Sequence, residues 1–274
     1  MANYTAADIK EIRETTGAGM LDVKKALDEA DGDKAKAVEL IRVKGLKGIA
    51  KREGRTASEG LIAVDVRDSE GGQTGTLVEL NSETDFVAKN DKFVALGDEA
   101  VAAAVESGAD EPEELAATAF GEALTNAGAT MGEKILVRRI GRVSGDAVTT
   151  YMHRTNKDLP PQVGVLVASD KAGAEVARDV AMHIAAFSPT YLSREEVPED
   201  IVENERRIAE ETAKNEGKPE KAISKIIEGR LNGYFKENVL LDQAFAKDPK
   251  QSVGKIVEAV GGTLTGFVRF RVGG

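Results

Sequence analysis

One order of segments occurs twice along the chain, and this recurrence constrains the fold more than any other feature of the sequence. Each occurrence holds two stretches of strand character, helical material and a closing strand. The first has strands near 61–66, 76–80 and 134–143, with helical stretches at 84–105 and 113–126. The second has strands at 147–153, 163–168 and 264–272, with a helical stretch at 174–186. We therefore expect an α+β fold built from two related sheet-and-helix units.

Turn signals make the first two strands of each unit a hairpin. Asp68-Ser-Glu-Gly-Gly72 separates them in the first unit, and a polar loop with prolines at 154–161 separates them in the second. Strands joined by a short connection run antiparallel. We expect one antiparallel sheet unit in residues 55–143 and another in residues 144–274.

The first 54 residues predict a three-helix module and a linker. Thr5 and Asp8 have the spacing of a capping box. Apolar residues then recur at helical spacing in three segments, which glycine-containing breaks at 16–19 and 31–33 separate. The apolar content of so short a module makes its core marginal by itself.

Two highly charged helical runs interrupt the second unit at residues 194–237. Gly217-Lys-Pro219 lies between them, which is typical of an antiparallel helix hairpin. The apolar stripe of each run is narrow, so it can close a seam between two helices but cannot cover a large core. We expect a coiled-coil hairpin that projects from the body. A helix pair packed on the sheet is the alternative.

Several kinds of chemistry are disfavoured by composition. The 274 residues include no Cys and only two His, His153 and His183, which leaves little for a metal site, and we expect no metal and no cofactor. No Gly-x-x-x-x-Gly-Lys-Ser/Thr phosphate loop occurs. The chain also lacks a long apolar run and a secretory pattern at its N-terminus. We expect an intracellular, cytoplasmic protein that does not contact membranes.

The charge of the chain is unevenly distributed. The net charge is −10, yet residues 1–55 hold 12 Lys and Arg against 10 Asp and Glu. The basic residues are densest at 44–55. Such a stretch can meet RNA, but a solvated helix face or an acidic protein partner explains it more commonly. An acidic body also argues against a general binder of phosphate backbones, so we expect no direct contact with nucleic acid.

Residues 81–91, Asn-Ser-Glu-Thr-Asp-Phe-Val-Ala-Lys-Asn-Asp, form a polar corner between a strand and a helix. Thr84 or Asp85 can cap the helix that follows. Phe86 is unusual there, because an aromatic ring finds little apolar surface in such a corner. It is either a staple folded back into the core or an exposed anchor for a partner.

Two long motifs resemble the bacterial translation elongation factor Ts family. They are Ile12-Arg-Glu-Thr-Thr-Gly-Ala-Gly-Met-Leu-Asp-Val-Lys-Lys-Ala-Leu27 and Glu79-Leu-Asn-Ser-Glu-Thr-Asp-Phe-Val-Ala-Lys-Asn90. The resemblance extends over nearly the whole chain, through Tyr151-Met-His153, the helix hairpin and the closing strand. It implies a UBA-like fold for the N-terminal module. It also implies a guanine nucleotide exchange factor for elongation factor Tu, without covalent chemistry of its own.

The same resemblance implies which residues act. In the family the Thr-Asp-Phe-Val corner displaces Mg²⁺ and GDP from the GTPase domain of elongation factor Tu and stabilises its nucleotide-free state. The matching residues here are Thr84, Asp85, Phe86 and Val87. Further partner contacts are expected from Met20, Lys89, Asn90 and His153. The hairpin is expected to reach a further domain of the partner.

The chain departs from the family pattern in three places. Ser82 and Val23 stand where cysteines are often found, which we interpret as packing positions. The loop at 154–161 is longer than the family's short turn, and the sequence ends at Gly274 without the extra C-terminal module of some members.

Two other classes of function compete with this interpretation. A hydrolase can use carboxylates such as Glu83 and Asp85, although no nucleophile and base accompany them. An RNA-binding adaptor can use the basic stretch at 44–55, although aromatic residues are scarce.

Overall fold

The computed structural model describes residues 3–274 and forms an α+β fold. The N-terminal helices are α1 (Ala6–Thr16), α2 (Met20–Glu29) and α3 (Lys34–Arg52). The first unit consists of β1 (Glu59–Ser69), β2 (Gly72–Ser82), α4 (Asp85–Ala88), α5 (Asp91–Ser107), α6 (Pro112–Ala116), α7 (Ala119–Met131) and β3 (Leu136–Gly145). The second unit consists of β4 (Ala147–His153), β5 (Val163–Ser169), α8 (Ala174–Phe187), α9 (Glu199–Asn215), α10 (Glu220–Asn238), β6 (Ala244–Phe245), β7 (Asp248–Ser252), α11 (Val253–Ala259) and β8 (Leu264–Arg271).

The predicted repeat is confirmed by the strand order of the two main sheets. The first sheet has the order β1-β2-β3 and the second β4-β5-β8, and all neighbouring strands are antiparallel. In each unit the second strand is central, and helices lie in the chain between it and the third strand. The sequence-derived order of elements therefore gives the same topology twice.

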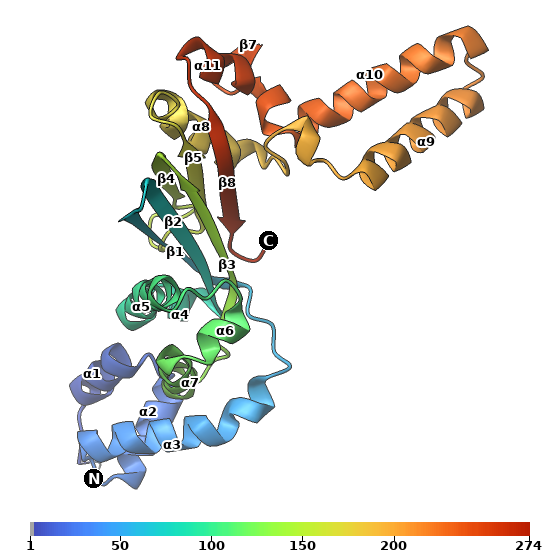
Figure 1. The fold of residues 1–274 in the computed structure, drawn as a ribbon. Coiled ribbons are helices and arrows are strands. Elements are labelled where there is room, and N and C mark those ends of the chain that lie inside the picture. Colours follow the sequence, from blue (N-terminus) through green and yellow to red (C-terminus); the bar gives the residue numbers. More distant parts are fainter. Residues whose placement is uncertain (1–2) are drawn as a thin grey trace.

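The two sheets pack face to face, with helices on their outer faces (Figure 1). Alternation along the central strands explains this arrangement, because successive side chains of a strand point to opposite faces. Leu77 and Leu166 lie in the apolar cluster between the sheets. Val78 packs toward the helices of the first unit, and Val165 packs toward those of the second. Both central strands are therefore buried on both faces.

The helical layer of the first unit contains more breaks than predicted. The stretch expected at 84–105 is two helices, because Asn90 ends one and caps the next by accepting the backbone N–H of Lys92 at 2.9 Å. The stretch expected at 113–126 is also two helices. Thr118 caps the second of them by accepting the N–H of Phe120 at 3.2 Å. Short polar side chains that compete for backbone groups produce both breaks.

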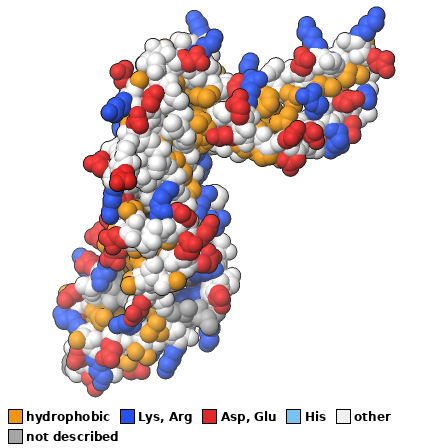
Figure 2. Space-filling model, in the orientation of Figure 1, with side chains coloured by type: hydrophobic (Ala, Val, Ile, Leu, Met, Phe, Trp, Pro, Cys, Tyr) orange, Lys and Arg blue, Asp and Glu red, His pale blue; other side chains and the backbone are white. Residues whose placement is uncertain are grey.

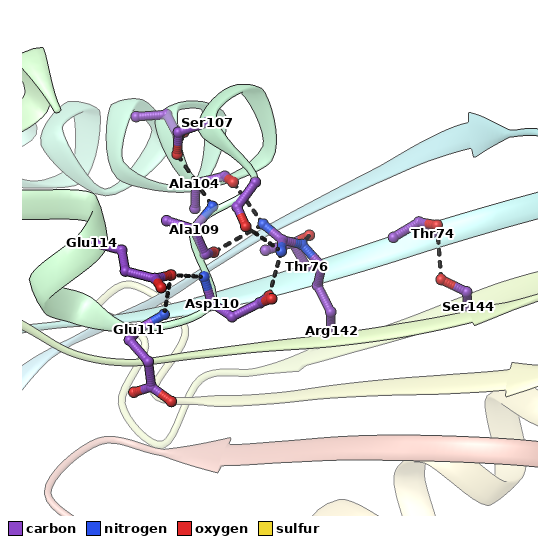
Figure 3. Close-up of polar contacts among 12 residues, drawn as sticks. Thr74, Thr76, Ala104, Ser107, Ala109, Asp110, Glu111, Glu114, Arg142 and Ser144 are labelled. Carbon is purple, nitrogen blue, oxygen red and sulfur yellow. Dashed lines mark hydrogen bonds and ion pairs between the residues drawn. The ribbon is translucent and has the colours of Figure 1, made fainter.

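The far end of α5 is held by Arg142 of β3 (Figure 3). Its guanidinium donates to the carbonyl oxygens of Ala104 at 2.6 Å, Ala109 at 3.0 Å and Gly108 at 3.3 Å, and it pairs with Asp110. These carbonyls at the end of α5 need partners outside the helix. One arginine therefore fixes α5 to the sheet at the end opposite to the 81–91 corner.

The three predicted N-terminal helices are present, and Thr5 and Asp8 form the predicted capping box. Their core contains Ile12, Val23, Ala26, Leu27, Ala30, Ala37 and Ile41. The module also packs on the body through α3 and α7, and a Cβ placed on Gly45 would lie 1.7 Å from the carbonyl oxygen of Ala129. Val43 of α3 is 42% exposed.

The predicted helix hairpin is formed by α9 and α10, which project from the body at the end opposite to the N-terminal helices (Figure 1). Gly217, with a φ of +67°, makes the turn between them. Figure 2 shows acidic and basic side chains interspersed along this arm and hydrophobic ones at its seam. Ala209, Ile227 and Leu231 fill the seam, whereas Ile208 is 42% exposed.

One small substructure was missing from the sequence-based prediction. The β6–β7 ribbon and α11 follow the hairpin and cover α8. His183 of α8 is buried beneath them, where its Nδ1 accepts the N–H of Ala246 at 3.2 Å and its Nε2 lies 2.8 Å from Gln243 Oε1. Burial lowers the pKa of His183. Among the helices of residues 3–274, none is long and apolar enough to cross a membrane.

Candidate functional site

The corner that follows β2 is a compact, capped structure. Thr84 adopts an extended backbone conformation and its Oγ1 accepts the N–H of Val87 at 3.4 Å, so it is the N-cap of the four-residue helix α4. Asn90 then caps α5, as described above. Two caps within seven residues leave the chain between them few alternative conformations.

Phe86 points away from the core at this corner. Its side chain is 72% exposed, the highest value among the large hydrophobic residues that are exposed in the described part of the chain. The ammonium of Lys89 lies 4.3 Å from the centroid of the ring and pairs with the carboxylate of Asp85 at 3.3 Å. The interpretation of Phe86 as a core staple is therefore wrong. The ring is a solvent-facing aromatic group with a cation on one side.

Val87, the next residue, has the opposite orientation. It is 4% exposed and belongs to the apolar core between the first sheet and its helices, as does Ala88. In the free chain its side chain therefore faces the core, and the expectation that Val87 contacts a partner stays a prediction. Its role at the corner is to attach α4 to the core, which fixes the direction in which Phe86 projects.

A pair of carboxylates supports the corner from beneath. Glu133 Oε2 accepts the backbone N–H groups of Glu83 and Thr84, each at 3.0 Å, and Glu133 Oε1 accepts the Thr84 hydroxyl at 2.5 Å. In return, Glu83 Oε1 accepts the N–H of Lys134 at 2.6 Å. Burial raises the pKa of Glu133, while its hydrogen bonds with Thr84 oppose that shift.

Sequence reasoning did not identify Glu133. It lies 49 residues from Thr84, between the end of α7 and the start of β3. No periodicity or local motif distinguishes a single glutamate in such a connection. Only the position of Lys134 at the start of the predicted third strand indicated that this segment returns to the edge of the sheet.

The N-terminal helices approach the corner from another side. Gly17 has a φ of +74°, and a Cβ placed on it would lie 3.3 Å from Asn90 Nδ2 and 3.1 Å from Met131 Cγ. The turn between α1 and α2 therefore lies against the corner. Met20 begins α2 and is 57% exposed, and Leu21 beside it is 70% exposed.

The structure brings most of the predicted residues into one region and leaves one elsewhere. Thr84, Asp85, Phe86, Lys89 and Asn90 form the corner, and the turn before Met20 contacts it. His153 lies at the end of β4 in the second unit. Its ring is exposed and stacks on Tyr151, with 6.0 Å between the ring centroids.

The two competing classes of function gain little from this geometry. Glu83 is bound by the N–H of Lys134 and by Arg55 at 3.2 Å, so it is not free to act as a hydrolytic acid or base. In the basic stretch, Lys44 pairs with Glu29, and Arg52 donates to the carbonyl of Gly45 at 2.6 Å. Two of the five basic side chains at 44–55, Lys44 and Arg55, are therefore paired with carboxylates of the protein, which reduces the positive charge available to RNA.

Comparison with known proteins decides the family. A family model described as Elongation factor TS matches residues 83–274, more than half of the chain. Elongation factor Ts of Beutenbergia cavernae is 65% identical to this chain, and that of Micrococcus luteus is 61% identical, with both alignments covering 100% of each protein. The chain belongs to the elongation factor Ts family. It is thus a translation elongation factor, and the family match begins at Glu83, within the Phe86 corner.

Membership of the elongation factor Ts family agrees with the chemistry available at the corner. The exposed groups there are an aromatic ring, a carboxylate and an ammonium, which suit contact with a protein surface. Ser82 and Val23, which we interpreted as packing positions, are fully buried.

Proposed function

We propose that this chain is the guanine nucleotide exchange factor of elongation factor Tu. It binds the GDP-bound partner, displaces Mg²⁺ and GDP, and stabilises the nucleotide-free state during translation elongation. The observation that carries this proposal is the exposure of Phe86, at 72%, on a corner whose other apolar residues are buried. An exposed aromatic side chain on a braced backbone has the character of an interface anchor.

The proposed exchange needs no covalent chemistry. A factor that binds the nucleotide-free partner more tightly than the GDP-bound partner must weaken GDP binding by the same ratio. Phe86 is the residue that makes this difference, because its ring enters the GTPase domain only when that domain is distorted. Exchange of this kind requires no metal or cofactor held by the chain itself.

Each corner residue has a distinct part in the proposal. Asp85 directs its charge toward the region of the partner that holds Mg²⁺, and Lys89 holds Asp85 and the Phe86 ring in place. Thr84 and Asn90 contribute through their caps, and Asn90 also meets the turn before Met20. Met20 and His153 are proposed as further contacts. Val87 is proposed to take part by fixing α4 to the core, since its side chain is buried.

The larger parts of the chain extend the contact with elongation factor Tu. The N-terminal module, residues 1–54, is proposed as a UBA-like domain that holds the GTPase domain through the exposed Met20. The interruption at 194–237 is proposed as a coiled coil that reaches a further domain of the partner. These parts, with the units at 55–143 and 144–274, act in the cytoplasm, where translation takes place.

Release of fluorescently labelled GDP from elongation factor Tu tests the proposal. Catalytic amounts of the chain should accelerate release, and Phe86→Ala should reduce that acceleration about thirtyfold, equivalent to the roughly 2 kcal/mol of an interface anchor. Because the ring is exposed, the same substitution should change the free energy of unfolding by about 0.5 kcal/mol or less.

Phe187→Ala is the matched control. Phe187 is an aromatic residue that is 54% exposed in the second unit, where it stacks on His183 with 4.6 Å between centroids. Its truncation should lower stability somewhat and leave exchange per folded molecule unchanged. Equal losses of exchange for the two variants would contradict the assignment of Phe86 as the anchor, and no acceleration by the wild-type chain would contradict the exchange function.

A further inference from the structure

We propose that Glu133 is a positioning residue for exchange: it holds the Phe86 corner in the conformation that the partner meets. This inference rests on the proposed function of Phe86. Glu133 contacts neither the ring nor the solvent-facing side of the corner. It acts through the backbone of Glu83 and Thr84, two residues before the aromatic ring.

The first support is the number of groups that Glu133 satisfies at one point. One oxygen accepts two adjacent backbone N–H groups and the other accepts the hydroxyl of the helix cap. These N–H groups lie at the start of α4, where a helix cannot supply partners of its own. Without Glu133, the backbone N–H groups of Glu83 and Thr84 lose their acceptor. The corner then depends on the 3.4 Å capping bond between Thr84 and Val87, the 3.1 Å bond from the Ser82 hydroxyl to the Thr84 carbonyl, the Glu83–Lys134 bond and the burial of Val87.

The second support is a comparison within the molecule. In the second unit, Asp170 follows the central strand β5 directly, as Glu83 follows β2, and its Oδ1 accepts the N–H of Thr263 just before β8. Glu83 makes the same connection to Lys134 just before β3. The connection from corner to third strand is thus common to both units, and the fold alone accounts for it.

Glu133 has no counterpart in that comparison. The residue before Lys134 is Glu133, whereas the residue before Thr263 is Gly262, which has no side chain. A Cβ on Gly262 would lie 2.4 Å from the backbone nitrogen of Gly173, so the second corner is closed by backbone packing. The first unit has a carboxylate at that place, and it is the unit whose corner presents an exposed aromatic ring.

Burying the ionised carboxylate of Glu133 also has an energetic cost of its own. Burial raises the pKa of Glu133, and the nearby charge of Glu83 contributes in the same direction. Its hydrogen bonds to the corner offset this cost only while the corner keeps its present shape. If the corner moves by about 1 Å, the Phe86 ring is misplaced by a similar distance. A displacement of that size is enough to reduce a geometry-dependent rate, such as that of exchange, by one or two orders of magnitude.

The test compares Glu133→Ala, Glu133→Gln and Asp170→Ala in the full chain. Glu133→Ala removes the acceptor for two backbone N–H groups, and Asp170→Ala does the same in the second unit, where Asp170 accepts from Gly173 at 2.7 Å and Thr263 at 3.0 Å. Both should therefore lower the melting temperature. Only Glu133→Ala should lower kcat/KM for GDP release from elongation factor Tu, by about tenfold per folded molecule.

Glu133→Gln should restore exchange to within about threefold of wild type, because its amide oxygen can accept both N–H groups and its amide nitrogen can donate to Thr84 Oγ1. Hydrogen–deuterium exchange should be faster in the peptide containing 83–90 for Glu133→Ala and unchanged there for Asp170→Ala. If Glu133→Ala does not fold, Glu133→Asp, whose carboxylate is one methylene shorter, should show the same loss of exchange in smaller measure.

Two results separate the failure of this inference from failure of the proposed function. If Phe86→Ala abolishes exchange while Glu133→Ala and Asp170→Ala exchange equally well per folded molecule, Glu133 is merely structural and the inference is overturned. In the double variant Phe86→Ala/Glu133→Ala, the loss due to Glu133 should disappear, since it acts through the ring. Additive losses would overturn the inference as well. Full exchange by Phe86→Ala overturns the proposed role of the ring instead.

Discussion

The two strand-to-helix corners of this molecule share a framework and differ in what they display. Each follows a central strand that ends in a fully buried serine, Ser82 or Ser169, and each begins with a carboxylate that accepts a backbone N–H from the segment before the third strand. The second corner then enters α8 directly. The first inserts the four-residue helix α4 and presents Phe86 to solvent. The shared part serves the fold, and the inserted part is available for function.

The comparison also explains why the motif at residues 79–90 contains both fully buried polar residues and exposed ones. Glu79, Asn81 and Ser82 are fully buried, whereas Phe86 and Lys89 are exposed. The buried residues attach the end of β2 to the neighbouring strands. The exposed residues project into solvent from the helix that follows. A functional residue on a short rigid element keeps its position better than one on a long loop.

The largest effects are expected where the central strands face the other unit. Four residues before the carboxylate that begins each corner, β2 has Glu79 and β5 has Leu166, both fully buried. Leu166→Ala should cost about 3 kcal/mol of unfolding free energy through the cavity that it leaves. Glu79→Ala should cost about 2 kcal/mol, because it removes the 2.7 Å ion pair to Arg139, whose side chain is 35% exposed, and the acceptor of the Gly273 N–H.

Urea denaturation measures both losses, and Asp65→Ala is the control. Asp65 pairs with Arg67 on the same strand, and that arginine side chain is 46% exposed. Removing a pair of this kind should cost about 0.5 kcal/mol. If Glu79→Ala lowers the free energy of unfolding no more than Asp65→Ala does, the contacts of Glu79 with Arg139 and Gly273 contribute little to stability. The inward faces of β2 and β5 would then differ in their contribution to stability.

Smaller effects are expected from the carboxylates common to both corners. Glu83→Ala removes a charged acceptor of one backbone N–H group and Asp170→Ala removes a charged acceptor of two, so both should lower the free energy of unfolding. The comparison predicts that both losses are measurable, as judged from urea midpoints with unchanged slopes. If Glu83→Ala strongly lowers the free energy of unfolding and Asp170→Ala leaves it unchanged, the two carboxylates do not have the same structural role in the two corners.

The sequence was informative where a pattern was local. The cap at Thr5, the turn at Gly217 and the strand character of 76–80 and 163–168 each depend on neighbouring residues, and all were predicted correctly. A cap at Thr84 or Asp85 was also predicted, and the structure assigns it to Thr84. The order of strands followed from the repeat. Local rules of this kind determine which elements form and in what order.

The sequence was less informative where a role depends on distant packing. The face of a helix as short as α4 cannot be read from periodicity, so the burial of Val87 beside the exposed Phe86 was not predicted. Phe86 kept two interpretations until its exposure was known. Glu133 was missed because its contacts with Thr84 span 49 residues.

The smallest expected effect is on the pH dependence of stability, and here the two corners should differ in sign. Burial raises the pKa of Glu133 above its ordinary value of 4.5, so the folded protein binds this proton more tightly than the unfolded chain does. Stability from this group is complete below about pH 4.5 and is lost as pH rises through its folded-state pKa. Hydrogen bonds from Gly173 and Thr263 lower the pKa of Asp170 below 3.8. Stability from that group is complete above about pH 3.8 and is lost on acidification through its folded-state pKa.

Urea midpoints between pH 3 and pH 7 for wild type, Glu133→Gln and Asp170→Asn test this difference, since the substitutions remove each titration in turn. Relative to wild type, Glu133→Gln should become more stable as pH rises above 4.5. Asp170→Asn should show its largest deficit above pH 3.8, and that deficit should shrink on acidification. Titrating groups remote from the two corners contribute equally to wild type and variant, so they cancel in these differences. Glu83, whose charge acts on Glu133, belongs to the first corner and contributes to the difference curve of Glu133→Gln. Difference curves of the same sign would mean that the two carboxylates experience similar surroundings, and the first corner would then lack the buried support that distinguishes it from the second.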